Sequence, residues 1–118
     1  MTEGQFVNAF FDFINRRDLD MLADLLTDDA EFYFPKTQPL LGKKQIVRFF
    51  RILFRQYPVL TFRVRREILN KEKAAIHWTN RGHNRKGVPY ENEGVTILEM
   101  ERGKIRYISD FFKDTGKF

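Results

Sequence analysis

The chain has 118 residues, a length that fits one domain built around one hydrophobic core. It contains no cysteine, which excludes a disulfide framework and thiolate chemistry, and no run approaches the roughly 18 apolar residues of a membrane span. The formal net charge is +5, but acidic residues are spread among the basic ones, so we expect a mixed solvated surface and no nucleic-acid partner.

Two helices are predicted at the start of the chain. Thr2 and Gln5 match a capping box, and large apolar residues then recur at helical spacing to about Asn15. Asp18 is a suitable N-cap for a second, short helix. We expect the buried side of that helix to consist of Leu19, Leu22, Leu25 and Leu26.

A short strand and a third helix follow. We expect a turn at residues 27–29, a strand at 30–34 ended by Pro35, and a loop that runs to Gly42. A helix is then predicted from about residue 43 to 56, because apolar residues return at helical spacing until Tyr57-Pro58 stops them.

From residue 59 onward the apolar period changes to two, which is typical of strands. The pattern predicts four strands, at residues 60–69, 74–82, 90–101 and 104–112. Gly103 supplies the positive φ that the last tight hairpin needs, and residues 114–118 read as a frayed tail. Helices that precede consecutive antiparallel strands indicate a single α+β domain over residues 1–118.

The alternation also predicts which side chains share a face of the sheet. Trp78 and Asn80 fall on one face and His77 on the other. Val95 and Ile97 lie opposite to the face that packs on the helices, and this apolar surface needs cover. We therefore expect a symmetric homodimer through the sheet.

Many positions along almost the whole chain resemble the nuclear transport factor two-like superfamily, and most closely its SnoaL-like polyketide cyclase branch. The residues that carry the resemblance are Asn15-Arg16-Arg17-Asp18-Leu19-Asp20, Leu26-Thr27-Asp28-Asp29-Ala30, Pro35, Gly42, Trp78, Gly82, Gly87, Gly94, Gly103-Lys104-Ile105 and Asp110-Phe111-Phe112. The resemblance implies a cone-shaped roll, commonly dimeric, in which three N-terminal helices pack against a curved, mostly antiparallel sheet. The superfamily includes isomerases, epoxide hydrolases, cyclases, dehydratases and non-catalytic binders, so the fold does not choose the function.

Two catalytic sets of the superfamily are not matched. The resemblance implies that the reaction of ketosteroid isomerase needs a tyrosine and two acids. At the matching positions this chain has Phe10, Phe34 (or Tyr33, if the short strand shifts by one) and Thr96.

The resemblance implies that the reaction of limonene epoxide hydrolase needs an Asp–Arg–Asp relay with a nearby tyrosine and asparagine. Here only the last-strand acid is kept, as Asp110, while the other positions hold Trp78, Asn80, Glu31 and Tyr33.

SnoaL-like cyclases use a last-strand aspartate as acid/base, and Asp110 matches it by resemblance. An aromatic pocket would raise the pKa of Asp110 and suit it to proton transfer. The alternative is a carboxylate paired with an arginine or capping a backbone group. Asn80 either orients a ligand or satisfies backbone groups, and Trp78 is either core or pocket wall.

We therefore expect a small-molecule-binding domain that acts on an apolar, oxygen-bearing ligand as a lyase, isomerase or cyclase. In this hypothesis Asp110 is the catalytic residue that moves a proton. The predicted substrate-binding residues are Tyr33, Trp78, Asn80, Phe10, Phe34, Thr96 and Glu31. No metal site or cofactor is predicted, because clustered ligands and phosphate-binding loops are absent. Without a signal-peptide pattern at the N-terminus, we expect a cytoplasmic protein. The alternative is a non-catalytic ligand-binding or protein-interaction module of the same fold.

Overall fold

The structure, a computed structural model, describes residues 1–117, and within them three helices precede most of a six-stranded sheet. The elements in chain order are α1 (Glu3–Arg16), α2 (Leu19–Asp24), β1 (Leu26–Tyr33), β2 (Leu40–Leu41), α3 (Lys43–Gln56), β3 (Val59–Asn70), β4 (Lys73–His83), β5 (Pro89–Glu101), β6 (Lys104–Phe112) and a 3-10 turn, η1 (Thr115–Lys117).

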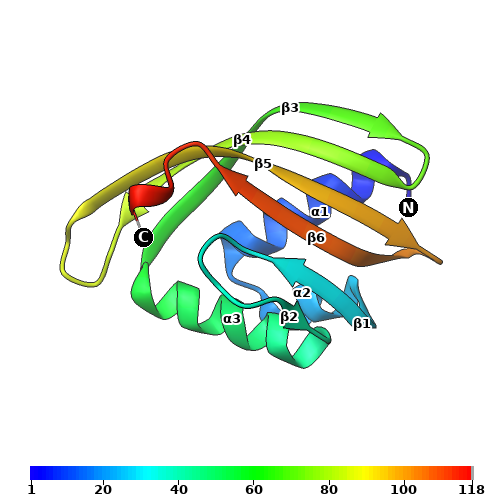
Figure 1. Ribbon diagram of the computed structural model, residues 1–118, viewed down its shortest axis with the longest axis horizontal. Helices are drawn as coiled ribbons and strands as arrows, with labels where there is room; N and C mark the ends of the chain where they lie inside the picture. Colours follow the sequence, from blue (N-terminus) through cyan, green and yellow to red (C-terminus); the bar gives the residue numbers. More distant parts are fainter. Residues whose placement is uncertain (118) are drawn as a thin grey trace.

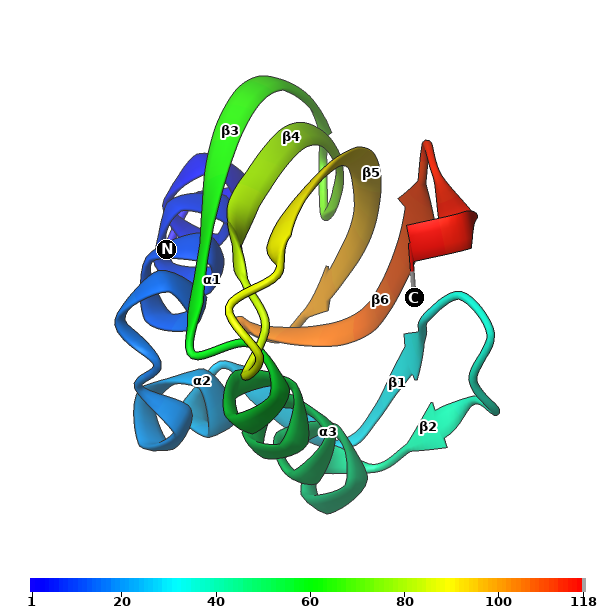
Figure 2. The ribbon, with the colours of Figure 1, turned by 90° about the vertical axis from the view of Figure 1, so that its left-hand side faces the viewer.

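The strands form one sheet in the order β2-β1-β6-β5-β4-β3. All neighbours are antiparallel except β1 and β6, which run parallel. The long strands curl over the helices, so that one face of the sheet encloses a tapering interior (Figures 1 and 2). This arrangement confirms the predicted α+β class and the mostly antiparallel curved sheet.

Local sequence signals at α1 act as expected. The Thr2 hydroxyl accepts from the Gln5 N–H at 3.2 Å, and the Gln5 side chain accepts from the Thr2 N–H at 2.8 Å. The end of α1 then reaches the sheet: the Asn15 side chain donates to the Phe62 carbonyl at 2.9 Å and accepts from the Phe62 N–H at 2.8 Å. Helix α1 is therefore fastened to the free edge of β3.

The region between α2 and α3 differs from the prediction. Residues 27–29 were expected as a turn, but they belong to β1, where the pairing with β6 shifts register between Leu26 and Glu31. Leu26 begins this strand instead of ending α2, since α2 stops at Asp24. The turn-forming residues are thus accommodated as an irregularity inside a strand.

The loop predicted after β1 and the tail predicted at the C-terminus also differ from the prediction. Strand β2, only two residues long, pairs with β1 inside the expected loop. At the C-terminus, the Asn92 side chain donates to the Asp114 carbonyl at 2.8 Å and accepts from the Asp114 N–H at 3.3 Å. These bonds hold the predicted tail as far as η1, and Phe118 lies outside the described residues.

Trp78 and Gly94 set the packing of the inner face. Trp78 is fully buried, and its ring lies across β5 directly over Gly94. A Cβ at Gly94 would lie 2.4 Å from the Phe111 carbonyl oxygen and 2.7 Å from the indole, so only glycine fits there. The indole meets the rings of Phe62 and Phe112 edge-on, with centroids 4.9 and 5.0 Å away.

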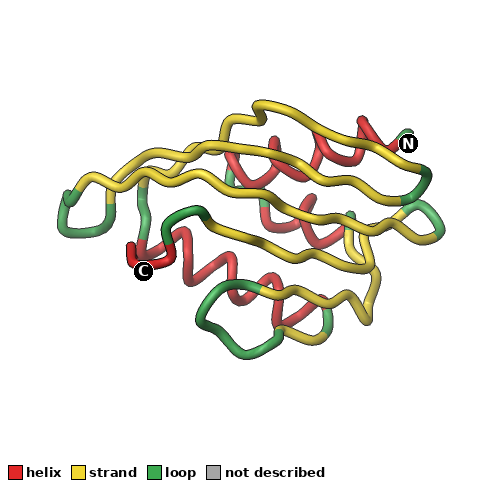
Figure 3. The backbone as a smooth tube through the Cα atoms, turned by 45° about the horizontal axis from the view of Figure 1, so that its top comes forward, coloured by secondary structure: helices red, strands yellow, loops and turns green. Residues whose placement is uncertain are grey.

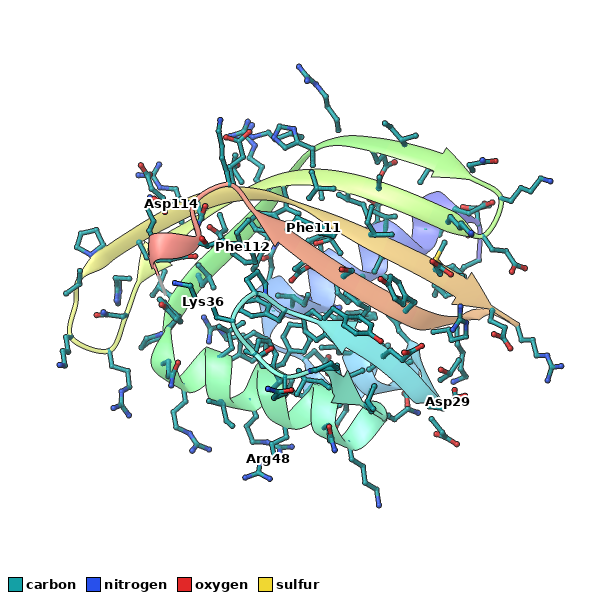
Figure 4. The ribbon with its side chains drawn as sticks, viewed as in Figure 1. Asp29, Lys36, Arg48, Phe111, Phe112 and Asp114 are labelled. Atoms are coloured by element: carbon teal, nitrogen blue, oxygen red, sulfur yellow. The ribbon has the colours of Figure 1, made fainter. Side chains whose placement is uncertain are left out.

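The outer face of the sheet matches the predicted alternation. Val95 and Ile97 are partly exposed there, and Phe111, paired with Val95, is 59% exposed. Figure 4 shows Phe111 and Phe112 at the end of β6, and the alternation sends Phe112 to the inner face. Helix α3 turns Arg48 away from the sheet in the same view (Figure 4).

No helix among residues 1–117 is both long and apolar enough to cross a membrane.

Candidate functional site

An apolar pocket of about 230 Å³ lies at the open end of the cone. It is bounded by α3, the segment after β1 and the inner face of β3, β4, β5 and β6, whose curvature is seen in Figure 3. Its lining residues are Phe34, Pro35, Lys36, Thr37, Phe49, Ile52, Leu53, Gln56, Tyr57, Leu60, Phe62, Asn80, Tyr90 and Phe112. Such a wall suits a small, largely apolar ligand.

Two polar side chains stand in this apolar wall. Asn80 is 4% exposed, and its side-chain carbonyl oxygen accepts no hydrogen bond from the described residues. The Tyr90 hydroxyl accepts from the Asn92 amide at 3.2 Å, which leaves its own hydrogen available as a donor. Burial raises the pKa of Tyr90, so the phenol stays protonated. The pocket therefore offers both an acceptor and a donor to a ligand.

Asp110 occupies the inner face of β6, directly opposite Thr96 of β5. The Thr96 hydroxyl donates to Asp110 Oδ1 at 2.6 Å, and the Trp78 indole N–H donates to the same hydroxyl at 2.8 Å. Three side chains from three neighbouring strands thus form one chain of hydrogen bonds.

The pKa of Asp110 is raised from 3.8 to about 7, because burial disfavours the carboxylate more than the hydrogen bond from Thr96 favours it. A carboxyl group with a pKa near neutrality can both accept and release a proton at physiological pH. The salt-bridged alternative considered for Asp110 is not seen, since no ion pair involves it among the described residues.

Asp110 reaches the exterior through a second opening, of about 370 Å³, at the sheet edge where β1 stops and β6 continues. Residues of the 33–37 and 109–115 segments line it. Phe34 and Phe112 line both this opening and the apolar pocket, and their ring centroids are 5.2 Å apart. These two aromatic rings form a partition between the pocket and the carboxyl group.

The other predicted site residues do not all lie at the pocket. Asn80 and Phe34 line the pocket, whereas Trp78 lies behind the pocket wall formed by Phe62 and Phe112. Phe10 is 2% exposed, belongs to the core on the helix side and lines neither cavity.

Tyr33 and Glu31 point away from the interior. The Tyr33 hydroxyl donates to Glu31 at 2.7 Å, and this bond raises the pKa of Tyr33. Glu31 in turn lies 3.5 Å from Arg106, which also pairs with Glu99. Tyr33 still borders the opening at Asp110, but Glu31 belongs to a surface ion-pair cluster.

Sequence reasoning missed Tyr90, Tyr57 and Gln56 as pocket residues. Tyr90 shares the inner-face alternation with Thr96 at a spacing of six residues, which is a signal for its face. The packing of Tyr57 against Tyr90, with centroids 5.1 Å apart, depends on where α3 ends relative to β5. That long-range contact leaves no local pattern.

A larger groove of about 850 Å³ lies on the other side of β3–β5, and it is lined mostly by charged and polar residues that include Arg63, Arg65 and Arg81. No group of three or more metal-ligating side chains occurs within residues 1–117. The candidate site therefore consists of the apolar pocket, the aromatic partition and Asp110.

Comparison with known families places almost the whole chain in one match: residues 7–108 match the SnoaL-like domain family. No match is found among curated proteins.

Solved structures with a similar fold share little sequence with this chain. A nuclear transport factor two-like protein from Burkholderia pseudomallei has a TM-score of 0.87 at 19% identity, covering 96% of this chain and 92% of that one. A protein from Jannaschia sp. CCS1 described as a SnoaL-like polyketide cyclase has a TM-score of 0.85 at 18% identity, covering 94% and 85%. TerC, co-crystallised with polyporic acid, has a TM-score of 0.84 at 17% identity, covering 94% and 91%.

Proposed function

Because the chain belongs to the SnoaL-like domain family, and because its cone holds both an apolar pocket and a titratable carboxyl group, we propose that it binds a small apolar, oxygen-bearing molecule and transfers a proton on it through Asp110. The reaction class is that of a lyase, isomerase or cyclase.

The observation that carries this proposal is the environment of Asp110. Its carboxyl group is hydrogen-bonded to Thr96, half-buried at an opening, and has a pKa of about 7. A structural carboxylate would instead be paired with a cation, as Glu99 is with Arg106. Asp110 is neither fully solvated nor neutralised by a cation, which supports an acid/base role.

The pocket supports the ligand class. Its aromatic and aliphatic wall favours a one- or two-ring molecule, and the Tyr90 hydroxyl and the Asn80 carbonyl provide one donor and one acceptor. TerC, a structural neighbour, was co-crystallised with a small molecule, polyporic acid.

The alternative, a binding module without turnover, is favoured by the aromatic partition. Phe34 and Phe112 stand between the pocket and Asp110, so a ligand in the pocket reaches the carboxyl group only if one of these rings moves. If the rings stay in place, the protein binds its ligand without proton transfer.

A test uses 2-tetralone, a two-ring ketone whose protons beside the carbonyl are acidic. In D₂O at pH 7, the native protein should accelerate exchange of these protons, followed by ¹H NMR, and Asp110→Asn should abolish the acceleration while 2-tetralone still raises Tm. Leu53→Trp, which fills the pocket, should remove both effects. Binding with no difference in exchange between the native protein and Asp110→Asn would favour the binding module instead.

We also propose a two-fold dimer through the outer face of the sheet. Val95, Ile97 and the 59% exposed Phe111 form an apolar strip there, flanked by the acidic and basic groups of the Arg106 and His77 clusters. Sedimentation equilibrium should give twice the 14.2 kDa chain mass at micromolar concentration, and V95K should reduce it to the monomer. A 14.2 kDa species for the native chain would refute the dimer.

A further inference from the structure

We propose that Trp78 and Thr96 are positioning residues that decide which oxygen of Asp110 carries the transferable proton. The catalytic meaning of this inference depends on the proposed function, because it concerns the same carboxyl group. The hydrogen-bond arrangement itself can be tested without any substrate.

The donors available along the chain of hydrogen bonds fix the direction of each bond. An indole N–H is only a donor, so the Trp78 N–H at 2.8 Å obliges the Thr96 oxygen to accept. A threonine hydroxyl has one hydrogen, and the contact from Thr96 to Asp110 Oδ1 is 2.6 Å. In the structure the single hydrogen of Thr96 is donated to Oδ1, which acts as an acceptor.

It follows that the proton of the neutral acid resides on Oδ2. Oδ1 is held by the Thr96 hydroxyl, and Oδ2 is the oxygen left for the opening that Asp110 lines between the 33–37 and 109–115 segments. A ligand from the apolar pocket would meet the proton on that side once Phe34 or Phe112 has moved.

Burial prevents water from replacing these hydrogen bonds. Trp78 is 0% exposed and Thr96 is 2% exposed, so no solvent competes for either contact. The indole is fixed by the rings of Phe62 and Phe112 and by the absence of a side chain at Gly94. The direction of the hydrogen bonds is thus set by packing before any ligand binds.

Among residues 1–117, Tyr33 of β1 is the one ionisable side chain besides Asp110 that lines this opening, and its hydroxyl donates to Glu31. Lys36, in the loop after β1, lines the apolar pocket instead of this opening. The segment after β6 contributes Thr115 to the opening, and the backbone of Asp114 is held by the Asn92 side chain. K36M is therefore included as a control for a nearby charge.

The chain has one tryptophan, so its indole N–H gives a single resonance that reports on the arrangement. In ¹H–¹⁵N spectra, the chemical shift of this resonance should change with pH. The midpoint of that change should equal the midpoint measured for the Asp110 carboxyl carbon. D110N should abolish that shift, K36M should keep it, and T96S should keep it because serine retains the hydroxyl. A resonance that titrates identically in D110N would overturn the proposal.

The carboxyl titration provides a second measurement. T96V removes a donor to the carboxylate, and the Asp110 pKa should rise by about one unit, the tenfold change expected from losing a charge-assisted hydrogen bond. W78F should raise the pKa in the native background and leave it unchanged in the T96V background, since Trp78 acts only through Thr96. Equal shifts from W78F in both backgrounds, or no shift from T96V, would refute the inference.

The proposed function and this inference fail separately. If D110N leaves 2-tetralone exchange unchanged while the indole still follows the carboxyl titration, proton transfer on that ketone fails and the positioning role stands. If D110N abolishes exchange while T96V and W78F leave the titration unchanged, the positioning role fails.

Discussion

The inner face of the sheet contains two regions built by the same alternation of side chains, one filled and one hollow. Toward the N-terminal helix, residues such as Phe10, Ile76 and Leu98 are almost fully buried and form one continuous core. Toward the β4–β5 hairpin, Asn80 and Tyr90 continue the same face but border a cavity of about 230 Å³. Trp78 lies at the boundary.

The difference between the regions lies in what covers the sheet. Helix α1 packs against β3 and β4 over the filled region, whereas the hollow region is bounded by one side of α3 and by the segment after β1. Polar residues are tolerated on the inner face only where that cover is incomplete or where a partner is supplied, as for Thr96. The cone therefore holds its polar groups at its open end.

The largest expected effect on stability comes from truncating Trp78, which lies at the boundary between the two regions. Trp78→Ala should lower the free energy of unfolding by about 3–5 kcal/mol, because a fully buried indole is lost from between two aromatic rings. Urea unfolding followed by circular dichroism measures this change. A loss below about 1 kcal/mol would mean that Trp78 belongs to the hollow region.

The pH dependence of stability should distinguish Asp110 from the packed region around it. Its pKa is about 7 in the folded chain and about 4 when unfolded, so between these values only the folded state holds the proton. This contribution to stability is complete below pH 4 and is lost as pH rises through 7, by about 4 kcal/mol. Asp110→Asn should remove this loss between pH 4 and 8 in urea titrations.

A smaller effect is expected from adding one methyl group beneath the indole. Gly94→Ala should cost about 1–3 kcal/mol, because the new Cβ meets both the Trp78 ring and the Phe111 carbonyl. Gly87→Ala is a control in open space, although its φ of 79° adds backbone strain of its own. A larger decrease in Tm for Gly87→Ala than for Gly94→Ala would contradict this packing.

The smallest effect is expected in the hollow region. Leu53 is only partly buried and borders the cavity, so Leu53→Ala should cost about 1 kcal/mol or less and enlarge the space for ligand. Urea unfolding compared with Trp78→Ala measures the contrast between the regions directly. Similar losses for the two variants would show that the pocket wall is packed as tightly as the core.

Local patterns predicted the elements that depend on neighbours in sequence. The capping box at Thr2, the helix stop at Tyr57-Pro58 and the glycine turn at Gly103, with φ of 78°, all appear in the structure. The parallel pairing of β1 with β6 was not predicted, because it joins residues about 75 positions apart and requires knowledge of the whole sheet.

The site divides in the same way. Alternation placed Asp110 on one face of its strand, and the family resemblance implied that this face looks toward Trp78. The structure adds that Thr96 links the two side chains. The separation of Asp110 from the pocket depends on Phe34 and Phe112, whose rings meet across 78 residues of sequence. No periodicity in either segment predicts that contact. The pocket and the carboxyl group were expected together, but they lie on opposite sides of these two rings.

The double hydrogen bond between Asn15 and Phe62 has a consequence for how the protein behaves in a crowded solution. An edge strand with free N–H and C=O groups is a template on which another chain can add a strand. The Asn15 amide occupies both backbone groups of Phe62, the fourth residue of β3. At the opposite edge β2 is only two residues long. Both margins of the sheet therefore resist the strand-by-strand stacking that leads to fibrils.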